Sequence, residues 1–564
     1  MRNKFVISIF FLILTFSASA QTLDPTVEVS REYEGKLIEV HKPSINMAVP
    51  DSVTRFALDF DYSVFANPYK GSYDFNPYLL SMKPSVSDNG ENRFYLRAGA
   101  GYQLRPTLDL VWSPGFKRNG FNLDVYALHR SFVGNYLTID PVNADGSKWV
   151  CDKISRNDTW CGYDLLSKAG VAARMDREKV AMNMDAGYFG LHQKDIEWER
   201  GFDALDATMS IVTKPEVFDN FVFDATVDYR LGRDKVSSSE LTENIFGVEL
   251  KMGPFRKDKH RVSFDVGADI ATYAGAFDVL AGNIYLAPRY VYRKDRFNAS
   301  LGLRFSKLLK SDDDAGMFSS PEQYVYPDVK ISYVLFPQSM KLYFEAGGGN
   351  YVDTYSSLIA ENHHLTHLMQ PIHLDYNVER VALIAGFDGR ITDKFSYNFR
   401  AGYTNYANMM HYAFDMSQAP RLYIEYVACQ KWFAALDWAL DVEGFRFDGT
   451  VSYDRYWGGS SVYDGSGSDQ KVVLRPAALT GQVALEYNWK KRLLCGLDCD
   501  FSTSRKGGVV VPGYADLGFC TEYATARNLS FWLRAGNLLN MTIQRSPLYA
   551  EKGVNVTLGI CVNL

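Results

Sequence analysis

The sequence predicts an all-β protein, a transmembrane antiparallel β-barrel of about 22 strands that follows a secretory signal. From about Glu91 to Leu564 the chain alternates apolar and polar residues in strand after strand, with almost no helical periodicity. The first twenty residues have the form of an export signal. A soluble β-sandwich can show the same alternation, so the two observations together, and not the alternation alone, favour the membrane barrel.

Met1–Ala20 has the parts of a secretory signal peptide. Arg2 and Lys4 supply the positive start, an apolar stretch follows, and Ala18–Ala20 forms a small-residue cleavage site. The apolar stretch is too short to cross a bilayer as a helix. The residue after the predicted cut is Gln21 and not cysteine, so we do not expect a lipoprotein anchor.

The composition agrees with a barrel and gives no support to nucleic-acid binding. Aromatic residues make up 14% of the chain, yet the mean hydropathy is slightly negative, −0.19. A barrel produces this combination because each lipid-facing residue is matched by a polar residue that faces the lumen. The net charge of −6 becomes −8 once Arg2 and Lys4 leave with the signal, which is modest for this length.

We predict three parts: residues 1–20 as the signal peptide, residues 21–90 as a short N-terminal segment, and residues 91–564 as the outer-membrane barrel. The N-terminal segment is either periplasmic or lumenal. Within it, Arg55–Pro84 is rich in aromatic residues and proline, too apolar for a solvated tail and too irregular for a separate core. We therefore expect this stretch to pack inside the barrel as a reduced plug.

The barrel strands follow from a period of two. In Phe395–Tyr403 the odd positions are aromatic or small and apolar, whereas the even positions are Ser396, Asn398, Arg400 and Gly402. Successive strand side chains point to opposite faces, so this segment has one apolar and one polar face. Similar segments begin at about 22 positions, near residues 93, 107, 121, 163, 178, 203, 221, 241, 259, 281, 296, 323, 340, 376, 394, 420, 445, 472, 492, 514, 529 and 552.

The connections alternate in length, which predicts the orientation of the barrel. Outer-membrane barrels keep short turns on the periplasmic side and long loops outside. Short turns are expected near residues 176–177, 254–258, 294–295, 337–339, 392–393 and 490–491. Long polar loops are expected near residues 132–162, 192–203, 309–322, 352–376, 457–471 and 504–513. Treating Arg421–Leu440 as one long strand keeps this alternation and makes the strand count even.

The lumen is where a binding site is expected. Charged residues on the polar face of the strands include Asp224, Asp228, Arg230, Asp265, Asp269, Arg304, Arg400 and Asp448. Mixed charges that pair across strands are the ordinary state of a polar lumen. The more specific hypothesis is that some of these residues form a substrate-binding site.

Cys151 and Cys161 flank a polar stretch between two expected strands. In an oxidising compartment such a pair favours a disulfide, with two free loop thiols as the alternative. The remaining cysteines lie within strands and have no metal-binding spacing.

No catalytic, cofactor or metal motif is expected, so the chain is not predicted to be an enzyme. Glu361, His363, His364 and His367 lie in the loop 352–376, where imidazole ligands would suit a metal, but a polar exposed loop commonly holds histidines. No nucleophile elbow is present, and no glycine-rich turn precedes a helix.

The C-terminal stretch Leu529–Leu564 resembles the last two strands of TonB-dependent receptor barrels. Ala535–Asn540, Ala-Gly-Asn-Leu-Leu-Asn, resembles their penultimate-strand element, and Gly553–Gly559 resembles their closing strand. The resemblance extends loosely over the whole barrel and implies an outer-membrane location in a Gram-negative cell.

Two departures from that family pattern concern the ends of the barrel region. Only about seventy residues, 21–90, precede the first strand, where the receptors carry a larger globular plug, and the last residue is Leu564 where an aromatic is usual. The stretch Thr26, Val27, Glu28 and Val29 resembles a TonB box, which adds a strand to a periplasmic TonB-type partner.

The predicted function is that of a transport pore or receptor for an unidentified solute, because about 22 strands enclose a wide lumen that must be filled or plugged. The alternative from another class is a non-conducting structural or assembly barrel that anchors envelope partner proteins. A surface adhesin that uses the long loops is a third hypothesis. The expected partners are outer-membrane lipid, and either a TonB-type periplasmic protein or a surface lipoprotein.

Overall fold

Strands form nearly all of the part of the chain that the structure describes. The structure is a computed structural model, and it describes residues 94–564 except 103, 115–119, 144–148, 197, 215–221, 258, 311–322, 338, 369–373, 416–420, 459–470, 507–508 and 527. The predicted signal peptide, the TonB-box-like stretch Thr26–Val29 and the expected plug lie outside the described residues. Within these ranges, no helix combines the length and the apolar character needed to cross a membrane.

The described residues form a single sheet and one short helix, α3 (Tyr355–Glu361). The strands are β1 (Phe94–Gly101), β2 (Thr107–Trp112), β3 (Phe121–Asn143), β4 (Trp149–Asp176), β5 (Val180–Lys194), β6 (Glu199–Thr213), β7 (Phe223–Val236), β8 (Ser239–Lys257), β9 (His260–Gly275), β10 (Val279–Lys294), β11 (Phe297–Lys310), β12 (Gln323–Phe336), β13 (Met340–Val352), β14 (Tyr376–Thr392), β15 (Phe395–Asp415), β16 (Arg421–Val442), β17 (Phe445–Gly458), β18 (Lys471–Val473), β19 (Leu479–Trp489), β20 (Leu493–Ser502), β21 (Arg505–Lys506), β22 (Val509–Val511), β23 (Tyr514–Ala526), β24 (Leu529–Gly536) and β25 (Asn555–Asn563).

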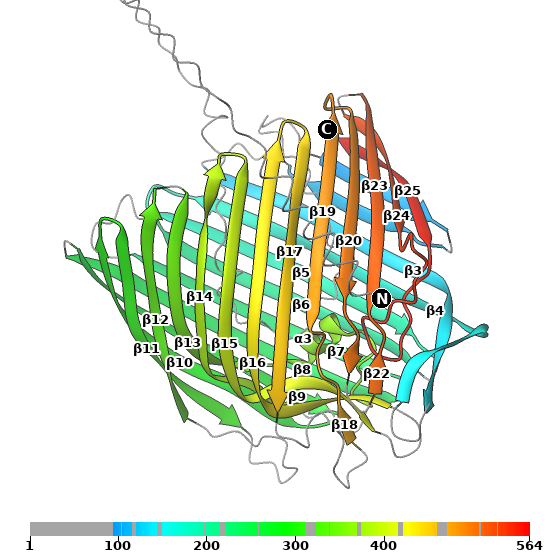
Figure 1. Cartoon of the computed structure of the whole chain (residues 1–564), viewed down its shortest axis with the longest axis horizontal. Coiled ribbons are helices and arrows are strands. Elements are labelled where there is room, and N and C mark those ends of the chain that lie inside the picture. Colours follow the sequence, from blue (N-terminus) through cyan, green and yellow to red (C-terminus); the bar gives the residue numbers. More distant parts are fainter. Residues whose placement is uncertain are drawn as a thin grey trace, which may run out of the picture. The chain divides into compact units, whose positions relative to one another are not determined.

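The sheet closes on itself into an antiparallel barrel of 22 strands, as the sequence predicted (Figure 1). The closing contact joins the first and the last strand, with Tyr95 opposite Asn563 and Gly101 opposite Thr557. The strands β18, β21 and β22 have only two or three residues each, and they are not counted among the 22 strands of the ring. Because every wall strand has two neighbours in the ladder, the barrel leaves no open sheet edge along most of its circumference.

The period-two pattern of the sequence becomes the two faces of the barrel wall. On β11, Leu301, Leu303 and Phe305 are exposed, and Arg304 between them points to the opposite face. The outer face is therefore a band of exposed apolar side chains. The inner face carries the polar and charged ones.

The longest connections lie at one end of the barrel, as predicted, but that end also has the short connections 195–198, 237–238 and 276–278. Short turns gather at the end that holds the C-terminus (Figure 1). They include 177–179 between β4 and β5, 295–296 between β10 and β11, and 443–444 between β16 and β17. The opposite end has the longer connections, including 353–375, 503–513 and 537–554. The region Arg421–Val442 is one strand, β16, which confirms the even count.

Two predicted loops are largely strand. The loop expected at 192–203 is only the four-residue connection 195–198 between β5 and β6. The sequence indicated a long polar loop at 132–162, but β3 continues to Asn143 and β4 begins at Trp149. The two strands stay paired through two irregularities in their register. The polar composition of this stretch misled the prediction, because a backbone ladder that projects beyond a membrane needs no apolar face.

Candidate functional site

The predicted lumen residues all lie on the face opposite to the exposed apolar band, and most have a partner on a neighbouring strand. The guanidinium carbon of Arg304 lies 3.8 Å from the ring centre of Tyr285. The other side-chain contacts are Asp228 with Thr208 (2.7 Å), Arg230 with Asp206 (2.5 Å), Asp265 with Arg289 (2.6 Å), Arg400 with Asp437 (2.9 Å) and Asp448 with Arg446 (2.8 Å). Asp224 is opposite Lys251 in the ladder, and Asp269 is opposite Gly247. Four of these eight charged residues are thus in ion pairs.

One level of the inner wall carries carboxylates on every second strand. Asp124, Asp185, Asp228 and Asp269 lie on β3, β5, β7 and β9, and the residues between them in the same row are Ala172, Thr208 and Gly247. We call these four aspartates the acidic row. Two strand spacings separate neighbours by about 10 Å, which is close to one Debye length at physiological salt. Their fields therefore overlap enough to favour cations along this wall.

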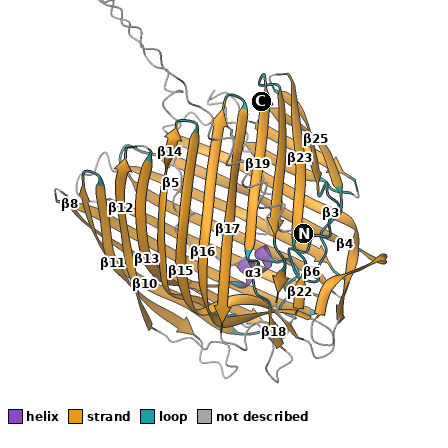
Figure 2. Cartoon of the chain, viewed as in Figure 1, coloured by secondary structure: helices purple, strands orange, loops and turns teal. Residues whose placement is uncertain are grey.

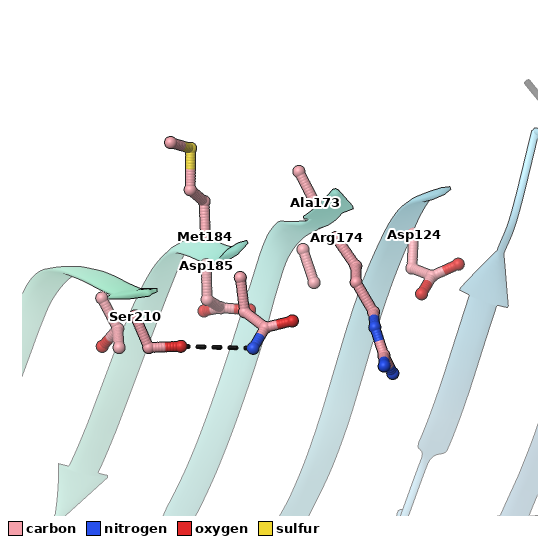
Figure 3. A pocket seen from close by; sticks show the side chains of 9 residues that line it. Asp124, Ala173, Arg174, Met184, Asp185 and Ser210 are labelled. Atoms are coloured by element: carbon pink, nitrogen blue, oxygen red, sulfur yellow. Dashed lines mark hydrogen bonds between the residues drawn. The ribbon is translucent and has the colours of Figure 1, made fainter. Parts of the chain in front are cut away.

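A shallow cavity of 270 Å³ lies along part of the acidic row and opens toward solvent (Figure 3). Figure 3 shows Asp124, Arg174 and Asp185 on one side of the sheet, with Met184 and Ala173 on the other. Near the cavity the amide of Asn183 donates to the Ser210 hydroxyl over 3.2 Å. The cavity is a depression in a polar wall and has no deep enclosure.

A loop from one side of the barrel crosses to the other side near the long-loop end. We call its described residues, 353–368 and 374–375 between β13 and β14, the inner loop. Figure 2 shows its helix α3 among the strands of the barrel. Tyr355, Leu358 and Ile359 of α3 are buried in an apolar cluster that also contains Leu191 of β5 and Phe202 of β6. In the ring, β6 is seven strands away from β13, so the inner loop packs against a distant part of the wall.

A buried charge cluster holds the inner loop to that wall. Arg200 of β6 and Asp234 of β7 are both inaccessible to solvent, with the Arg200 Nε atom 3.3 Å from the Asp234 Oδ1 atom. Arg200 also donates to the backbone carbonyl oxygens of His363, at 2.7 Å, and Leu365, and to the Tyr355 hydroxyl at 3.1 Å. The Tyr355 hydroxyl in turn donates to Asp234 over 2.5 Å. We call these residues, together with His367, the Arg200 cluster.

The start of α3 is held by a second set of buried groups. The Tyr273 hydroxyl of β9 accepts a hydrogen bond from the Tyr355 backbone N–H at 3.1 Å and donates to Glu243 of β8 at 3.0 Å. The Glu243 carboxylate accepts the Ser356 backbone N–H at 3.2 Å. These contacts satisfy N–H groups that the first turn of a helix leaves without an internal partner. Burial raises the pKa of the Tyr355 hydroxyl well above its usual range, so Tyr355 stays a hydrogen-bond donor.

The three histidines of the inner loop face three different carboxylates. The Nδ1 atoms of His363, His364 and His367 lie 3.5, 3.8 and 3.2 Å from Asp164, Asp195 and Asp234, respectively. The histidines therefore do not converge on one point, as a metal site would require. Among the described residues, no group of three or more His, Cys, Asp or Glu side chains is arranged to hold a metal ion.

A second connection enters from the other side and meets the inner loop. We call Asn537–Val554, between β24 and β25, the seam segment. Its Tyr549 ring stacks on His364 with the ring centres 3.6 Å apart. Burial lowers the pKa of His364, so the stacked imidazole is neutral near pH 7. Together the two connections cover the lumen near the long-loop end.

Arg545 makes a network of ion pairs in the seam segment. The Arg545 Nη2 atom lies 2.7 Å from Asp500 and 3.0 Å from Asp516, and its Nη1 atom lies 2.5 Å from Glu551. Arg505 donates to the backbone carbonyl oxygen of Arg545 over 3.0 Å. Burial raises the pKa of Glu551, and the neighbouring Arg545 opposes that rise.

The inner loop is the structural feature that the sequence prediction missed. The loop 352–376 was expected to be polar and exposed, but its described part is mostly buried. One signal was present: Tyr355, Leu358 and Ile359 recur at helical spacing after Thr354, whose side chain caps the helix by accepting from the Ser357 N–H. Apolar residues at that spacing inside a supposed loop indicate a buried turn of helix.

The structure also corrects the predicted disulfide. Cys151 and Cys161 are both free and lie on the same strand, β4. Cys161 is opposite Asn135 of β3, and Cys151 lies beyond the level of Asp140. The levels of the two cysteines along β3 are therefore at least five residues apart, from Asn135 to Asp140, which corresponds to about 17 Å. A disulfide requires the two Cα atoms to lie within about 7 Å of each other. The thiols were taken for loop residues because the outer part of β4 is polar.

The sequence matches no protein-family model and no curated protein. The fold, however, is similar to several solved structures. They include the copper transporter OprC (TM-score 0.59, 13% identity, 84% of this chain and 80% of that chain) and the siderophore receptor PiuA from Acinetobacter baumannii (TM-score 0.58, 10% identity, 84% and 82%). The FrpB iron transporter from Neisseria meningitidis is similar over 84% of this chain and 81% of its own, with a TM-score of 0.63 and 9% identity.

These neighbours are TonB-dependent receptors, and their barrels are closed rings of 22 strands. The chain therefore has the TonB-dependent-receptor barrel fold, as the resemblance of Leu529–Leu564 implied. The motif at Ala535–Asn540 has a structural role here: the Asn537 side chain accepts from the Met541 N–H at 2.9 Å and donates to the Met541 carbonyl oxygen at 2.8 Å. It thereby shapes the turn with which the seam segment leaves β24.

Proposed function

We propose that the protein is an outer-membrane receptor or pore that admits a solute and is closed in this state by its own inner loop. The barrel supplies an apolar outer band and a polar lumen, which is the arrangement a membrane pore needs. The similar solved structures are transporters or receptors for copper, iron or siderophores and not enzymes. We extend to this chain only the general role of outer-membrane uptake.

The observation that carries the proposal is the attachment of the inner loop across the lumen. The Arg200 cluster is fully buried and joins the loop to wall strands far from its own. A loop that served only to cap the hairpin β13–β14 would gain nothing from a charge cluster at a distant strand. A detachable cover over the lumen accounts for this arrangement.

Removing the cover tests the proposal. Val352 and Tyr376 are directly opposite each other in the ladder, so a two-residue Asn-Gly turn can replace residues 353–375 without straining β13 or β14. We expect this variant to conduct ions in a planar bilayer well above the wild-type level. Deleting Gln21–Pro84 alone and in combination with the loop separates the contribution of the expected N-terminal plug.

The alternative function is a non-conducting barrel that anchors envelope partner proteins. The extensive burial inside the lumen favours it, because a barrel that never opens can afford a packed interior. If the doubly deleted protein inserts into bilayers but stays at the wild-type conductance, the pore hypothesis fails and the anchoring role stands. Co-purification with a surface lipoprotein, or with a TonB-type protein through Thr26–Val29, would then identify the partner.

The acidic row predicts the charge preference of the opened pore. In the variant that lacks the inner loop, changing Asp124, Asp185, Asp228 and Asp269 to asparagine should shift the reversal potential in a salt gradient toward anions. The reason is that four negative fields along one wall concentrate cations. A control is Asp176→Asn at the end of β4, outside the row, where Lys214 pairs with the carboxylate. Equal reversal potentials in all three proteins would contradict a role for the row.

A further inference from the structure

The short turns at one end of the barrel are basic. At the end that holds the C-terminus, the turns 177–179, 295–296, 393–394 and 490–492 all contain lysine or arginine, and Lys259 lies just before β9. We call these the basic turns. The short turns at this end also contain acidic residues, which the basic ones outnumber: Glu178, Asp295, Asp393 and Glu443. As a group these turns are therefore positive, although the whole chain carries a net charge of −6.

The short turns at the opposite end of the barrel lack this charge. The connections 195–198, 237–238 and 276–278 contain no lysine or arginine, and two of them contain aspartate, Asp195 and Asp278. Tight turns at both ends have the same conformational task, which favours Asn, Asp, Gly and Ser. A task that is common to both ends does not explain the difference in charge. The basic residues therefore serve something that is present at one end only.

The turn 490–492 carries its charge at a conformational cost. Lys490 and Lys491 have φ angles of 50° and 57°, and the Arg492 N–H closes the turn by donating to the Trp489 carbonyl oxygen over 3.0 Å. Asn-Gly is the favoured sequence where both central residues of a turn have positive φ, because a Cβ atom is disfavoured there. Within the described part of the chain, Lys490, Lys491 and Arg492 are in no ion pair that would offset this cost. Their three charges are thus available to a partner outside the chain.

Outward-facing aromatic residues lie directly beside this turn. Tyr487 and Trp489 of β19 are exposed, and so is Tyr523 of β23, which is opposite Leu493 in the ladder. The Lys490 Nζ atom lies 5.0 Å from the centre of the Trp489 ring. Aromatic rings at the edge of the apolar band mark the level of the lipid headgroups. The basic turn therefore lies at the headgroups of the leaflet on the short-turn side.

The same arrangement recurs at the turn between β10 and β11, and β12 to β17 separate the two turns on the ring. Lys294 and Arg296 are exposed there, and neither is in an ion pair with another residue of the described ranges. Beside them on the outer face are the exposed rings of Tyr290 and Phe297. The basic turns are thus distributed around the barrel. Lipid surrounds a barrel on all sides, whereas a single docked protein would cover one side.

We propose that the basic turns bind the headgroups of anionic phospholipids in the inner leaflet of the outer membrane. Short turns lie on the periplasmic side of such barrels, which is the side of that leaflet. Ammonium and guanidinium groups pair with the lipid phosphate, and phosphatidylglycerol attracts them more strongly than phosphatidylethanolamine because its net charge is negative. The neighbouring aromatic rings set the depth at which the turns meet the headgroups. The inference rests on the proposed outer-membrane location but does not require that the barrel conduct ions.

Photo-crosslinking identifies the lipid beside the turn 490–492 in the full chain. The photoreactive residue benzoylphenylalanine replaces either Tyr487, near the turn, or Tyr453 of β17, which is also exposed and pairs with Leu479 at the far end of β19. In vesicles of equal parts phosphatidylglycerol and phosphatidylethanolamine, both leaflets contain both lipids. At low salt, the ratio of labelled phosphatidylglycerol to labelled phosphatidylethanolamine should be at least about fivefold higher at Tyr487, because each Lys or Arg near an anionic surface strengthens the attraction by about that factor.

Changing the turn removes its charge without loosening the fold. Lys490→Asn with Lys491→Gly supplies the sequence that the turn conformation favours, and Arg492→Gln removes the third charge. This triple variant should lower the lipid ratio at Tyr487 to that at Tyr453, whereas Lys490→Arg with Lys491→Arg should preserve it. Equal ratios at the two probes, or an unchanged ratio in the triple variant, would overturn the proposal, and a periplasmic protein as the true partner would give that result. Absence of lipid labelling at both probes would instead overturn the membrane location on which the proposal rests.

Discussion

Arg200→Ala should release the inner loop and leave the rest of the barrel closed. Arg200 and Asp234 are both inaccessible to solvent, so the alanine variant leaves a buried carboxylate without its cation. It also leaves the carbonyl oxygens of His363 and Leu365 without a donor. Breaking a buried ion pair by removing one partner costs about 3–5 kcal/mol. The loop can avoid this cost by leaving the wall, whereas the ladder of 22 strands has no contact that depends on Arg200.

Hydrogen exchange of the α3 amides measures this release. A cost of about 3 kcal/mol shifts the opening equilibrium roughly 100-fold, so exchange in Tyr355–Glu361 should accelerate by that order. Exchange in the wall strands should not change. The variant should also conduct ions more often than the wild type in a planar bilayer, provided the N-terminal segment is removed from both proteins.

The chain offers a matched control on the neighbouring strand. Arg233 of β7 pairs with Glu240 over 2.5 Å, but the two side chains are 64% and 43% exposed. Exposed ion pairs contribute about 0–1 kcal/mol, so Arg233→Ala should leave α3 exchange nearly unchanged. Arg200→Lys should lie between the two, because lysine keeps the charge but lacks the fork that reaches two carbonyl oxygens at once. Equal exchange rates in Arg200→Ala and Arg233→Ala would show that the cluster does not hold the loop.

The barrel could be predicted from the sequence because its determinants are local. Alternation along each strand specifies which residues face lipid, and it needs no knowledge of distant contacts. The alternation of short and long connections then predicted that Arg421–Val442 is one strand and not two. Two strands there would have placed a long loop among the short turns. The short turns near 295 and 490 also follow from local residues, and Asp295, Lys490 and Lys491 adopt the positive φ that tight turns require.

The cover of the lumen could not be predicted in the same way because its contacts are distant in the chain. Arg200 and His363 are 163 residues apart, and nothing in either neighbourhood indicates the other. A charged residue on the lumenal face of a strand was expected to contact water, and nothing in the sequence distinguishes the buried Asp234 from the exposed Asp228. Burial inside a barrel depends on which loop folds inward, and alternation carries no information about that choice.

The contacts of the seam segment could not be predicted from the sequence for the same reason. The resemblance of Ala535–Asn540 and Gly553–Gly559 to the last strands of receptor barrels located β24 and β25 within a few residues. It did not indicate that the residues between them meet β3, β4 and the inner loop, whose residues are more than 150 positions away in the chain.

Gly559→Val should prevent the barrel from closing. Gly559 of β25 lies directly opposite Gly99 of β1 and also opposite Trp532 of β24, so the three residues form one row across the closing strands. The Trp532 indole covers both glycines, is 6% exposed, and donates to the Ile560 carbonyl oxygen over 3.2 Å. A Cβ atom at Gly559 would overlap the Ala98 carbonyl oxygen and the indole ring. We expect the variant to lack the heat-sensitive gel mobility of a closed barrel.

The same substitution elsewhere separates a steric effect from a general effect of valine in a strand. Gly347→Val in β13 adds a side chain where no atom lies within 4 Å of the new Cβ, so that protein should close as the wild type does. Adding Trp532→Ala to Gly559→Val removes the overlap with the ring but leaves the overlap with the backbone oxygen of Ala98. Because a backbone atom of a closing ladder cannot move aside as a side chain can, the double variant should still fail to close. Normal heat-modifiable mobility of Gly559→Val, or full rescue by Trp532→Ala, would mean that β1 and β25 are not held in the register that brings Gly99 and Gly559 together.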